Sequence, residues 1–151
     1  MRNTIKTSFL AALLFFISSP AMAQMKVYVQ PSAQDAVGGR LAYAIKEGVR
    51  RSSGMSLADR DEDAALTVSI VTLDPDRNTQ TSSTRTIYSV VWTVKTLHST
   101  PIDMYLTNSV GLCGSSKIAE CADGLVADTD EQVTKVKGWL RSALEKSKQK
   151  N

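Results

Sequence analysis

The chain has 151 residues, of which 42% are hydrophobic and 22% are charged, and this composition is typical of a globular protein. It has 18 basic and 15 acidic side chains. Two of the basic ones, Arg2 and Lys6, lie in the first 23 residues, so 16 basic and 15 acidic side chains remain in the rest. Because nucleic-acid-binding proteins need a surface of one sign, this near-balance argues against that class.

The amino-terminal segment has the features of a bacterial signal peptide. The two basic residues precede an apolar run over residues 9–17, and small residues stand at Ala21 and Ala23, as cleavage requires. We therefore expect residues 1–23 to be a signal peptide. Residues 24–151 are then expected to form a single domain in the periplasm or outside the cell.

No membrane anchor is expected in the mature domain. The apolar run of the signal segment is well short of the roughly 20 residues that span a bilayer, and no later stretch could span one. The residue after the expected cleavage site is Gln24 rather than a cysteine, so a lipid anchor of the bacterial lipoprotein type is not predicted. We expect neither an integral membrane segment nor nucleic acid as a partner.

The start of the domain predicts a strand followed by a helix. Residues 26–30 alternate in polarity and predict a strand that Pro31 ends. Ser32 and Asp35 have the spacing of a capping box, and Gly54 is a typical helix stop. The helix between them has hydrophobic residues four apart, which predict its buried stripe: Val37, Leu41, Ile45 and Val49.

Two adjacent glycines, Gly38 and Gly39, lie early in this helix. Each costs about 1 kcal/mol relative to alanine in a helix interior, so a reason for them is expected. They lack the spacing of a phosphate-binding loop, and close packing of the helix on the sheet is the favoured explanation. Residues 55–58 then predict a short strand.

Three segments between Leu66 and Val110 alternate with a period of two and predict an antiparallel meander. One face is expected to be apolar and covered by the helices: Leu66, Val68, Ile70, Tyr88, Val90, Trp92, Val94, Ile102, Met104 and Leu106. The other face is expected to be polar and available to a partner: Thr67, Ser69, Val71, Ser89, Val91, Thr93, Tyr105 and Thr107.

The carboxyl-terminal part predicts a short helical turn over residues 117–122, ended by Gly124, and then a long helix that begins at Asp128 or Thr129. Its buried stripe is expected to be Val133, Val136, Leu140, Ala143 and Leu144, with Trp139 at the border. The basic tail is most simply explained by the negative end of the helix dipole and by solubility: Lys146, Lys148 and Lys150. The predicted fold class is α+β, a two-layer sandwich of a mainly antiparallel sheet with two long helices on one face.

Both cysteines, Cys113 and Cys121, lie close together in a chain that is expected to be exported, and a disulfide is predicted between them. A metal pair or a reactive thiol are the alternatives. His98 is the single histidine, so the usual four soft ligands of a metal site are not available. Neither a metal nor another cofactor is predicted.

The segment from Leu41 to Gly54, followed by the strand that contains Ala64-Ala65-Leu66-Thr67-Val68-Ser69-Ile70, resembles the small periplasmic α/β domains of envelope-assembly proteins. This group includes the amino-terminal domain of TolB, the curli secretion lipoprotein CsgG and the lipopolysaccharide-assembly lipoprotein LptE. The resemblance implies non-enzymatic docking of other envelope components, and it carries over no site residue.

The favoured function is therefore an exported, non-enzymatic interaction or assembly module of the bacterial envelope, with a protein partner. Its possible interface is the polar sheet face: Thr67, Ser69, Val71, Val91, Thr93, Tyr105 and Thr107. One alternative is an inhibitor or small-ligand-binding protein that uses the disulfide loop as a rigid protrusion. Another is an enzyme with a Cys113–His98 couple oriented by Asp103.

Overall fold

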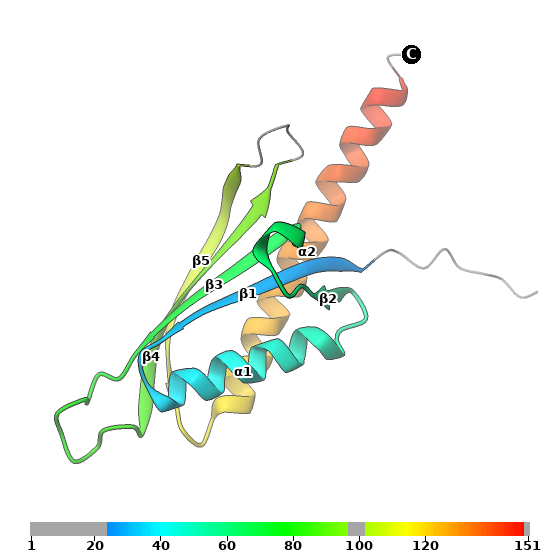
Figure 1. The fold of residues 1–151 in the computed structure, drawn as a ribbon. Coiled ribbons are helices and arrows are strands. Elements are labelled where there is room, and N and C mark those ends of the chain that lie inside the picture. The colour runs from blue at the N-terminus through cyan, green and yellow to red at the C-terminus, as the bar shows by residue number, and fades with distance from the viewer. Residues whose placement is uncertain (1–23, 97–101, 150–151) are drawn as a thin grey trace, which may run out of the picture.

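A computed structural model describes residues 24–96 and 102–149, which form a five-stranded sheet with two helices on one of its faces (Figure 1). The order of the strands is β2-β1-β3-β4-β5. The elements in chain order are β1 (Met25–Ala33), α1 (Ala36–Arg51), β2 (Met55–Leu57), the short 3-10 helix η1 (Asp61–Asp63), β3 (Leu66–Leu73), β4 (Arg85–Lys95), β5 (Asp103–Gly114) and α2 (Ile118–Lys148). The predicted signal peptide lies outside the described residues.

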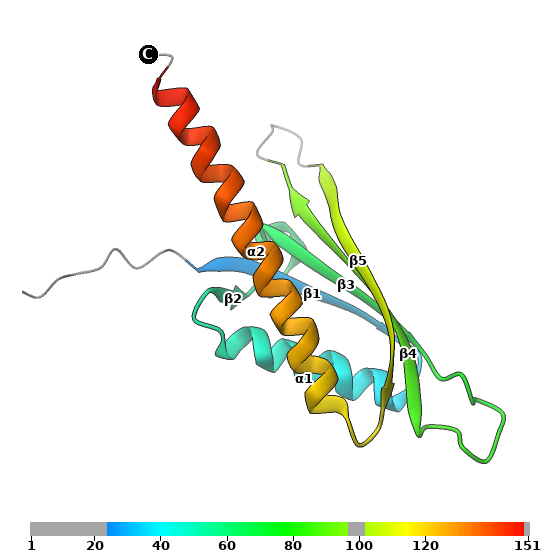
Figure 2. The ribbon, with the colours of Figure 1, turned by 180° about the vertical axis from the view of Figure 1, so that it is seen from behind.

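The predicted fold class is confirmed. Strands β3, β4 and β5 pair antiparallel as the expected meander, while β1 pairs parallel with both β2 and β3. Both helices lie on the same side of the sheet, and Figure 2 shows α2 crossing α1 there. Gly48 of α1 lies at this crossing, because a Cβ at that position would overlap the side chain of Val126 in α2. The two layers therefore enclose one core, and neither α1 nor α2 lies on the opposite face of the sheet.

Strand β1 continues through Pro31, which was expected to end it. The carbonyl of Val27 accepts from Ala58 N at 2.8 Å on the β2 side, and the carbonyl of Lys26 accepts from Ala65 N at 3.0 Å on the β3 side. Pro31 is four residues after Val27, so its backbone nitrogen points to the same side of β1 as that of Val27. On that side β2 has already ended at Leu57. A missing N–H costs no ladder bond at such an open edge.

Helix α1 confirms the predicted stripe, since Val37, Leu41, Ile45 and Val49 are all fully buried. The expected capping box is wrong by one turn. Asp35, rather than Ser32, is the N-cap, and its Oδ1 accepts from Gly38 N at 2.7 Å. A single carboxylate directly before the helix satisfies one of its orphan amides without help from a second residue.

The close approach expected at the paired glycines holds for only one of them. A Cβ on Gly38 would overlap the side chain of Thr72 in β3, whereas a Cβ on Gly39 would meet nothing within 4 Å. Gly38 therefore sets the distance between the start of α1 and the sheet, and nothing in the structure explains Gly39.

Helix α2 is one continuous helix of 31 residues, so the predicted break at Gly124 and the predicted start at Asp128 or Thr129 are wrong. Thr129 is fully buried inside the helix and donates from Oγ1 to the carbonyl of Leu125 at 2.7 Å. Its Oγ1 also accepts from Trp92 Nε1 at 2.9 Å. Thr129 and Gln132 have the spacing of a capping box, but Thr129 lies inside the helix, where its hydroxyl is hydrogen-bonded to Trp92 of the sheet.

The outer half of the predicted α2 stripe is not buried. Val133 and Val136 are buried, with only 1% and 4% of their surface exposed. Trp139, Leu140, Ala143 and Leu144 are exposed. Figure 1 shows why, because the last turns of α2 run on beyond the sheet that covers its first half. The apolar stripe of α2 therefore continues for several residues beyond the end of the sheet on which its first half packs.

Strand β5 contains a β-bulge that reverses the predicted faces of its second half. Met104 pairs with Val94 on the helix side, but Thr107 rather than Leu106 pairs with Trp92, and the register shifts between Trp92 and Thr93. One extra residue on one strand turns every later side chain to the other face. Thr107 therefore lies on the helix side of the sheet, opposite to its predicted face.

Candidate functional site

The candidate site is the face of the sheet that neither α1 nor α2 covers, called here the open face. The pairing of β3, β4 and β5 aligns its side chains in rows across the strands. From the β4–β5 hairpin end toward the 74–84 loop these rows are Thr67–Thr93–Tyr105, Ser69–Val91–Asn108, Val71–Ser89–Val110 and Leu73–Ile87–Leu112. The first two rows are mainly polar and the last two are mainly apolar.

The apolar half of the open face is a contiguous patch on three neighbouring strands. Its members, called here the apolar patch, are exposed at 49%, 47%, 39%, 68% and 55%: Val71, Leu73, Ile87, Val110 and Leu112 respectively. Leu73, Ile87 and Leu112 are directly paired across the strands. Neighbouring apolar side chains that stay in water mark a binding surface more often than isolated ones do.

The polar half of the open face is organised by its own hydrogen bonds. Ser69 Oγ donates to Gln30 Oε1 at 3.2 Å, and Tyr105 Oη donates to Asn108 Oδ1 at 2.9 Å. Tyr105 is exposed at 62% and presents its ring to solvent. This half combines an exposed aromatic ring with hydrogen-bonding groups, a combination that is common at protein interfaces.

The structure places most, but not all, of the predicted interface residues on the open face. Ser69, Val71, Val91, Thr93 and Tyr105 lie there. Thr67 is on the strand side that belongs to the open face, but only 5% of its surface is exposed. Asp61 of η1 covers it and accepts a hydrogen bond from its Oγ1 at 2.6 Å. Thr107 lies on the helix side because of the bulge.

Ion pairs bound the open face at both ends. At the hairpin end, Lys95 Nζ lies 2.6 Å from Asp61 Oδ2 and 3.2 Å from Asp103 Oδ1. The hydrogen bond from Lys95, together with that from Thr67, lowers the pKa of Asp61, and the bond to Asp61 raises the pKa of Lys95. At the other end, Arg85 bonds Asp76 through Nε at 2.6 Å and Nη2 at 3.0 Å, which lowers the pKa of Asp76.

The loop between β3 and β4 is held by one carboxylate. Asp74 accepts hydrogen bonds from Ser83 N at 2.8 Å, Asp76 N at 2.8 Å and Ser82 Oγ at 2.9 Å. The backbone bond from Ser83 is the main cause of the lowered pKa of Asp74. These bonds fix the loop beside the apolar patch, whose Leu73 directly precedes Asp74.

Cys113 and Cys121 form the predicted disulfide, with their Cα atoms 6.2 Å apart. Cys113 is fully buried and has no thiol to act as a nucleophile, so the Cys113–His98 couple is not formed; His98 itself lies outside the described residues. Asp103, the proposed orienting group, is paired with Lys95. Among the described residues, no group of three or more metal-ligating side chains is found.

The disulfide loop is part of the packed structure. Ser115 N donates to the carbonyl of Thr84 at 2.8 Å, and the residues from Ile118 to Cys121 are the first turn of α2. An inhibitor that relies on a protruding loop is therefore not supported by this geometry.

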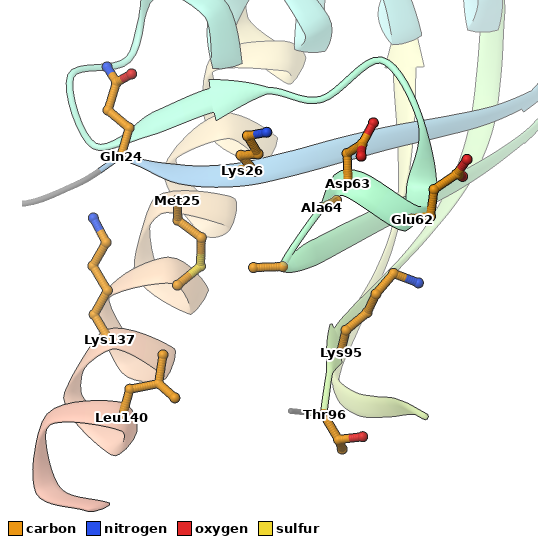
Figure 3. A pocket seen from close by; sticks show the side chains of 11 residues that line it. Gln24, Met25, Lys26, Glu62, Asp63, Ala64, Lys95, Thr96, Lys137 and Leu140 are labelled. Atoms are coloured by element: carbon orange, nitrogen blue, oxygen red, sulfur yellow. The ribbon is translucent and has the colours of Figure 1, made fainter. Parts of the chain in front are cut away.

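A separate pocket of about 510 Å³ lies at one end of the sheet, between β1, η1, the end of β4 and α2. In Figure 3, Met25 of β1 and Leu140 of α2 extend toward one another along it. Two of the lysines that line it are engaged, since Lys137 Nζ donates to the carbonyl of Gly54 at 3.1 Å and Lys95 pairs with carboxylates. The residues that line the pocket offer apolar walls without a nucleophile–base pair.

The exposed patch residues Leu73, Ile87, Val110 and Leu112 were missed by reasoning from the sequence. A signal for two of them was present. If Cys113 is bonded to a helix that covers the sheet, then Val110 and Leu112, at odd separations from it, must face the other way. Because Met104 also faces the helices, the strand between Met104 and Cys113 has to contain a bulge.

Residues 25–147 match the LptE family, which is described as lipopolysaccharide-assembly. The chain belongs to the LptE family. The match covers nearly all of the described residues, a much longer stretch than the segments that first suggested the resemblance. The description of the LptE family concerns assembly of an envelope component rather than a chemical reaction.

Two further comparisons add little to the LptE assignment. A comparison with curated proteins gives no match. One solved structure, a PelC dodecamer from Paraburkholderia phytofirmans, is similar to this chain at 15% identity and a TM-score of 0.43, over 72% of this chain and 92% of that one. A likeness at this level carries no information about function. None of the helices in the described part of this LptE-family chain is long and apolar enough to cross a membrane.

Proposed function

We propose that this LptE-family chain is an exported, single-domain, non-enzymatic module of envelope assembly that docks a protein partner on its open face. The observation that carries the proposal is the apolar patch on three adjacent strands, on the side away from both helices. Family membership supports a role in envelope assembly, and the signal-peptide features of residues 1–23 support export.

The partner is expected to place apolar side chains on the apolar patch and hydrogen-bonding groups on the polar half. Fully burying a leucine or valine side chain contributes about 1.5–3 kcal/mol, so the patch can supply most of the binding free energy. The polar rows beyond it, with Tyr105 and Asn108, then fix the orientation of the partner.

The proposal is tested by photo-cross-linking in living cells. A photoreactive amino acid at position 110 or 112 is expected to give one discrete adduct with an envelope protein, and Val110→Lys with Leu112→Lys should abolish that adduct from a probe at position 105. A probe at Tyr43, which is 66% exposed on α1, is the matched control and should give no such adduct. Circular dichroism and a thermal melt confirm folding. Adducts that are equal at Tyr43 and at position 112, or none at either, would rule out the open face.

A further inference from the structure

The part of α2 that runs beyond the sheet is a second exposed apolar surface, separate from the apolar patch. Every residue from Gly138 to Gln149 is exposed. Three large hydrophobic side chains in this end are exposed at 56%, 41% and 63%: Trp139, Leu140 and Leu144. Side chains of this size in water, at helical spacing, indicate that the end of α2 is covered when the protein acts.

The side chains of this helix end are arranged as in helices that lie on a membrane surface. At 3.6 residues per turn, the residues from Val136 to Leu144 that are apolar fall within an arc of about 140° bounded by Trp139 and Leu144. Lys135 and Lys146 border this arc beside Trp139. Lys137, Arg141 and Lys148 border it beside Leu144, whereas the acidic Glu145 lies opposite the arc.

Charge in the molecule is segregated toward this end. Residues 135–149 contain five basic side chains and one acidic one, a net charge of +4. The other residues of the expected mature chain then have 11 basic and 14 acidic side chains, a net charge of −3. The nearby acids are locally paired: Glu62 and Asp63 each lie 3.0 Å from Arg60, and Asp103 lies 3.2 Å from Lys95.

A second element presents apolar side chains at the same end of the molecule. Ile102 and Met104, at the end of the β4–β5 hairpin, are exposed at 59% and 48%. Figure 1 shows this hairpin end and the last turns of α2 reaching the same side of the molecule, away from the 74–84 loop. The two elements therefore lie at the same end of the molecule.

We propose that this end of the molecule binds the surface of a bilayer that contains anionic phospholipids. Trp139, Leu140 and Leu144 enter the interfacial region, and Lys146 and Lys148, one on each border of the arc, contact the headgroups. A second copy of the chain is a poorer occupant, because two helix ends of charge +4 would repel each other. Basic side chains on both borders of the apolar arc hold the helix axis along the surface.

The test uses the protein purified after export from its full-length gene, and vesicles of phosphatidylcholine with or without phosphatidylglycerol. The protein should float with the vesicles that contain phosphatidylglycerol and remain behind with pure phosphatidylcholine. Lys146→Gln and Lys148→Gln should each weaken binding about fivefold and reduce its salt dependence. Trp139→Ser with Leu144→Ser should abolish flotation.

Matched controls separate this surface from the proposed docking face. Val110→Ser with Leu112→Ser, which removes side chains of similar exposure from the open face, should leave flotation unchanged. Tryptophan fluorescence gives an independent measurement of binding. Trp92 has only 1% of its surface exposed, so Trp139 is the tryptophan that responds to the vesicles. A blue shift on adding anionic vesicles should disappear in Trp139→Phe.

Three results would overturn the proposal: no flotation with either vesicle, equal flotation with both, or flotation that survives Trp139→Ser with Leu144→Ser. Recovery of an acidic protein on this helix end without vesicle binding would also overturn it, in favour of a protein partner. None of these results would affect the cross-linking test of the open face.

Discussion

Trp92 Nε1 donates a hydrogen bond to Thr129 Oγ1 at 2.9 Å, and this bond joins the centre of β4 to the middle of α2 inside the core. Both side chains are buried, so the indole N–H has no access to water. The sheet and the long helix are thereby fixed in one relative position by a polar contact as well as by hydrophobic packing.

Thr129→Val is expected to destabilise the protein by about 1–3 kcal/mol, because it leaves the indole N–H buried without a partner. The measurement is urea unfolding monitored by circular dichroism. In a Trp92→Phe background, where there is no N–H to satisfy, the same substitution should cost clearly less. A cost that is the same in both backgrounds would show that the hydrogen bond does not contribute.

Gly38→Ala and Gly39→Ala should have opposite effects although the residues are adjacent in α1. A methyl group at position 38 overlaps the side chain of Thr72 and is expected to destabilise by about 1–3 kcal/mol. At position 39 the methyl group meets no atom within 4 Å, so the higher helix propensity of alanine should stabilise by about 0.5–1 kcal/mol. Thermal melts of the two variants decide, and a destabilising Gly39→Ala would contradict the open space found beside that position.

Replacing both cysteines, as Cys113→Ala with Cys121→Ala, should destabilise the protein by about 2.5 kcal/mol in the chain-entropy model for so short a loop. Cys113 is fully buried, and the small cavity left by its sulfur adds to this cost. Unfolding of the wild type with and without a reductant gives the comparison. The double variant should be insensitive to the reductant, and equal stability of the reduced and oxidised wild type would contradict the prediction.

The Asp61–Lys95 contact should make stability fall in acid. The pKa of Asp61 is lowered in the folded state, chiefly by its hydrogen bond with Lys95, so its contribution is present above the unfolded pKa of about 3.9 and is lost as the pH falls through the folded pKa. Asp61→Asn should therefore lower stability at pH 7, and the difference from the wild type should shrink as the pH falls below the unfolded pKa. Because Asp61 is partly exposed, the loss at pH 7 should be below about 1 kcal/mol. Asp59→Asn, an exposed change before η1, is the control and should have little effect at neutral or acid pH.

Local periodicity predicted the elements whose environment is uniform along their length. The stripe of α1 and the inward face of β3 and β4, including Trp92, follow from spacing alone because each is covered along most of its length. The apolar stripe of α2 was equally visible in the sequence, but spacing indicates which side of a helix is apolar and not where its partner stops. The exposure of Leu140 and Leu144 depends on the length of the sheet, which is a tertiary property.

The other errors have a similar origin. Ser32 and Thr129 have the composition of helix starts, but the first lies in a strand and the hydroxyl of the second is used by Trp92, a residue 37 positions away. No residue in the neighbouring sequence indicates the bulge in β5. Strict alternation therefore assigned Thr107 to the wrong face and did not indicate that Val110 and Leu112 are exposed. Two of the five apolar-patch residues, Val110 and Leu112, thus depended on one extra residue in one strand.

Because of the bulge, the disulfide can form only in one register of β5. Counting alternately from Met104, an unbulged β5 would turn Leu112 toward α2 and Cys113 away from it. Cys113 can reach Cys121 only when the extra residue has been accommodated near Leu106. During oxidative folding, closure of this bond would therefore select the chains whose last strand has paired correctly, and a chain that slipped by one residue would be left with two free thiols.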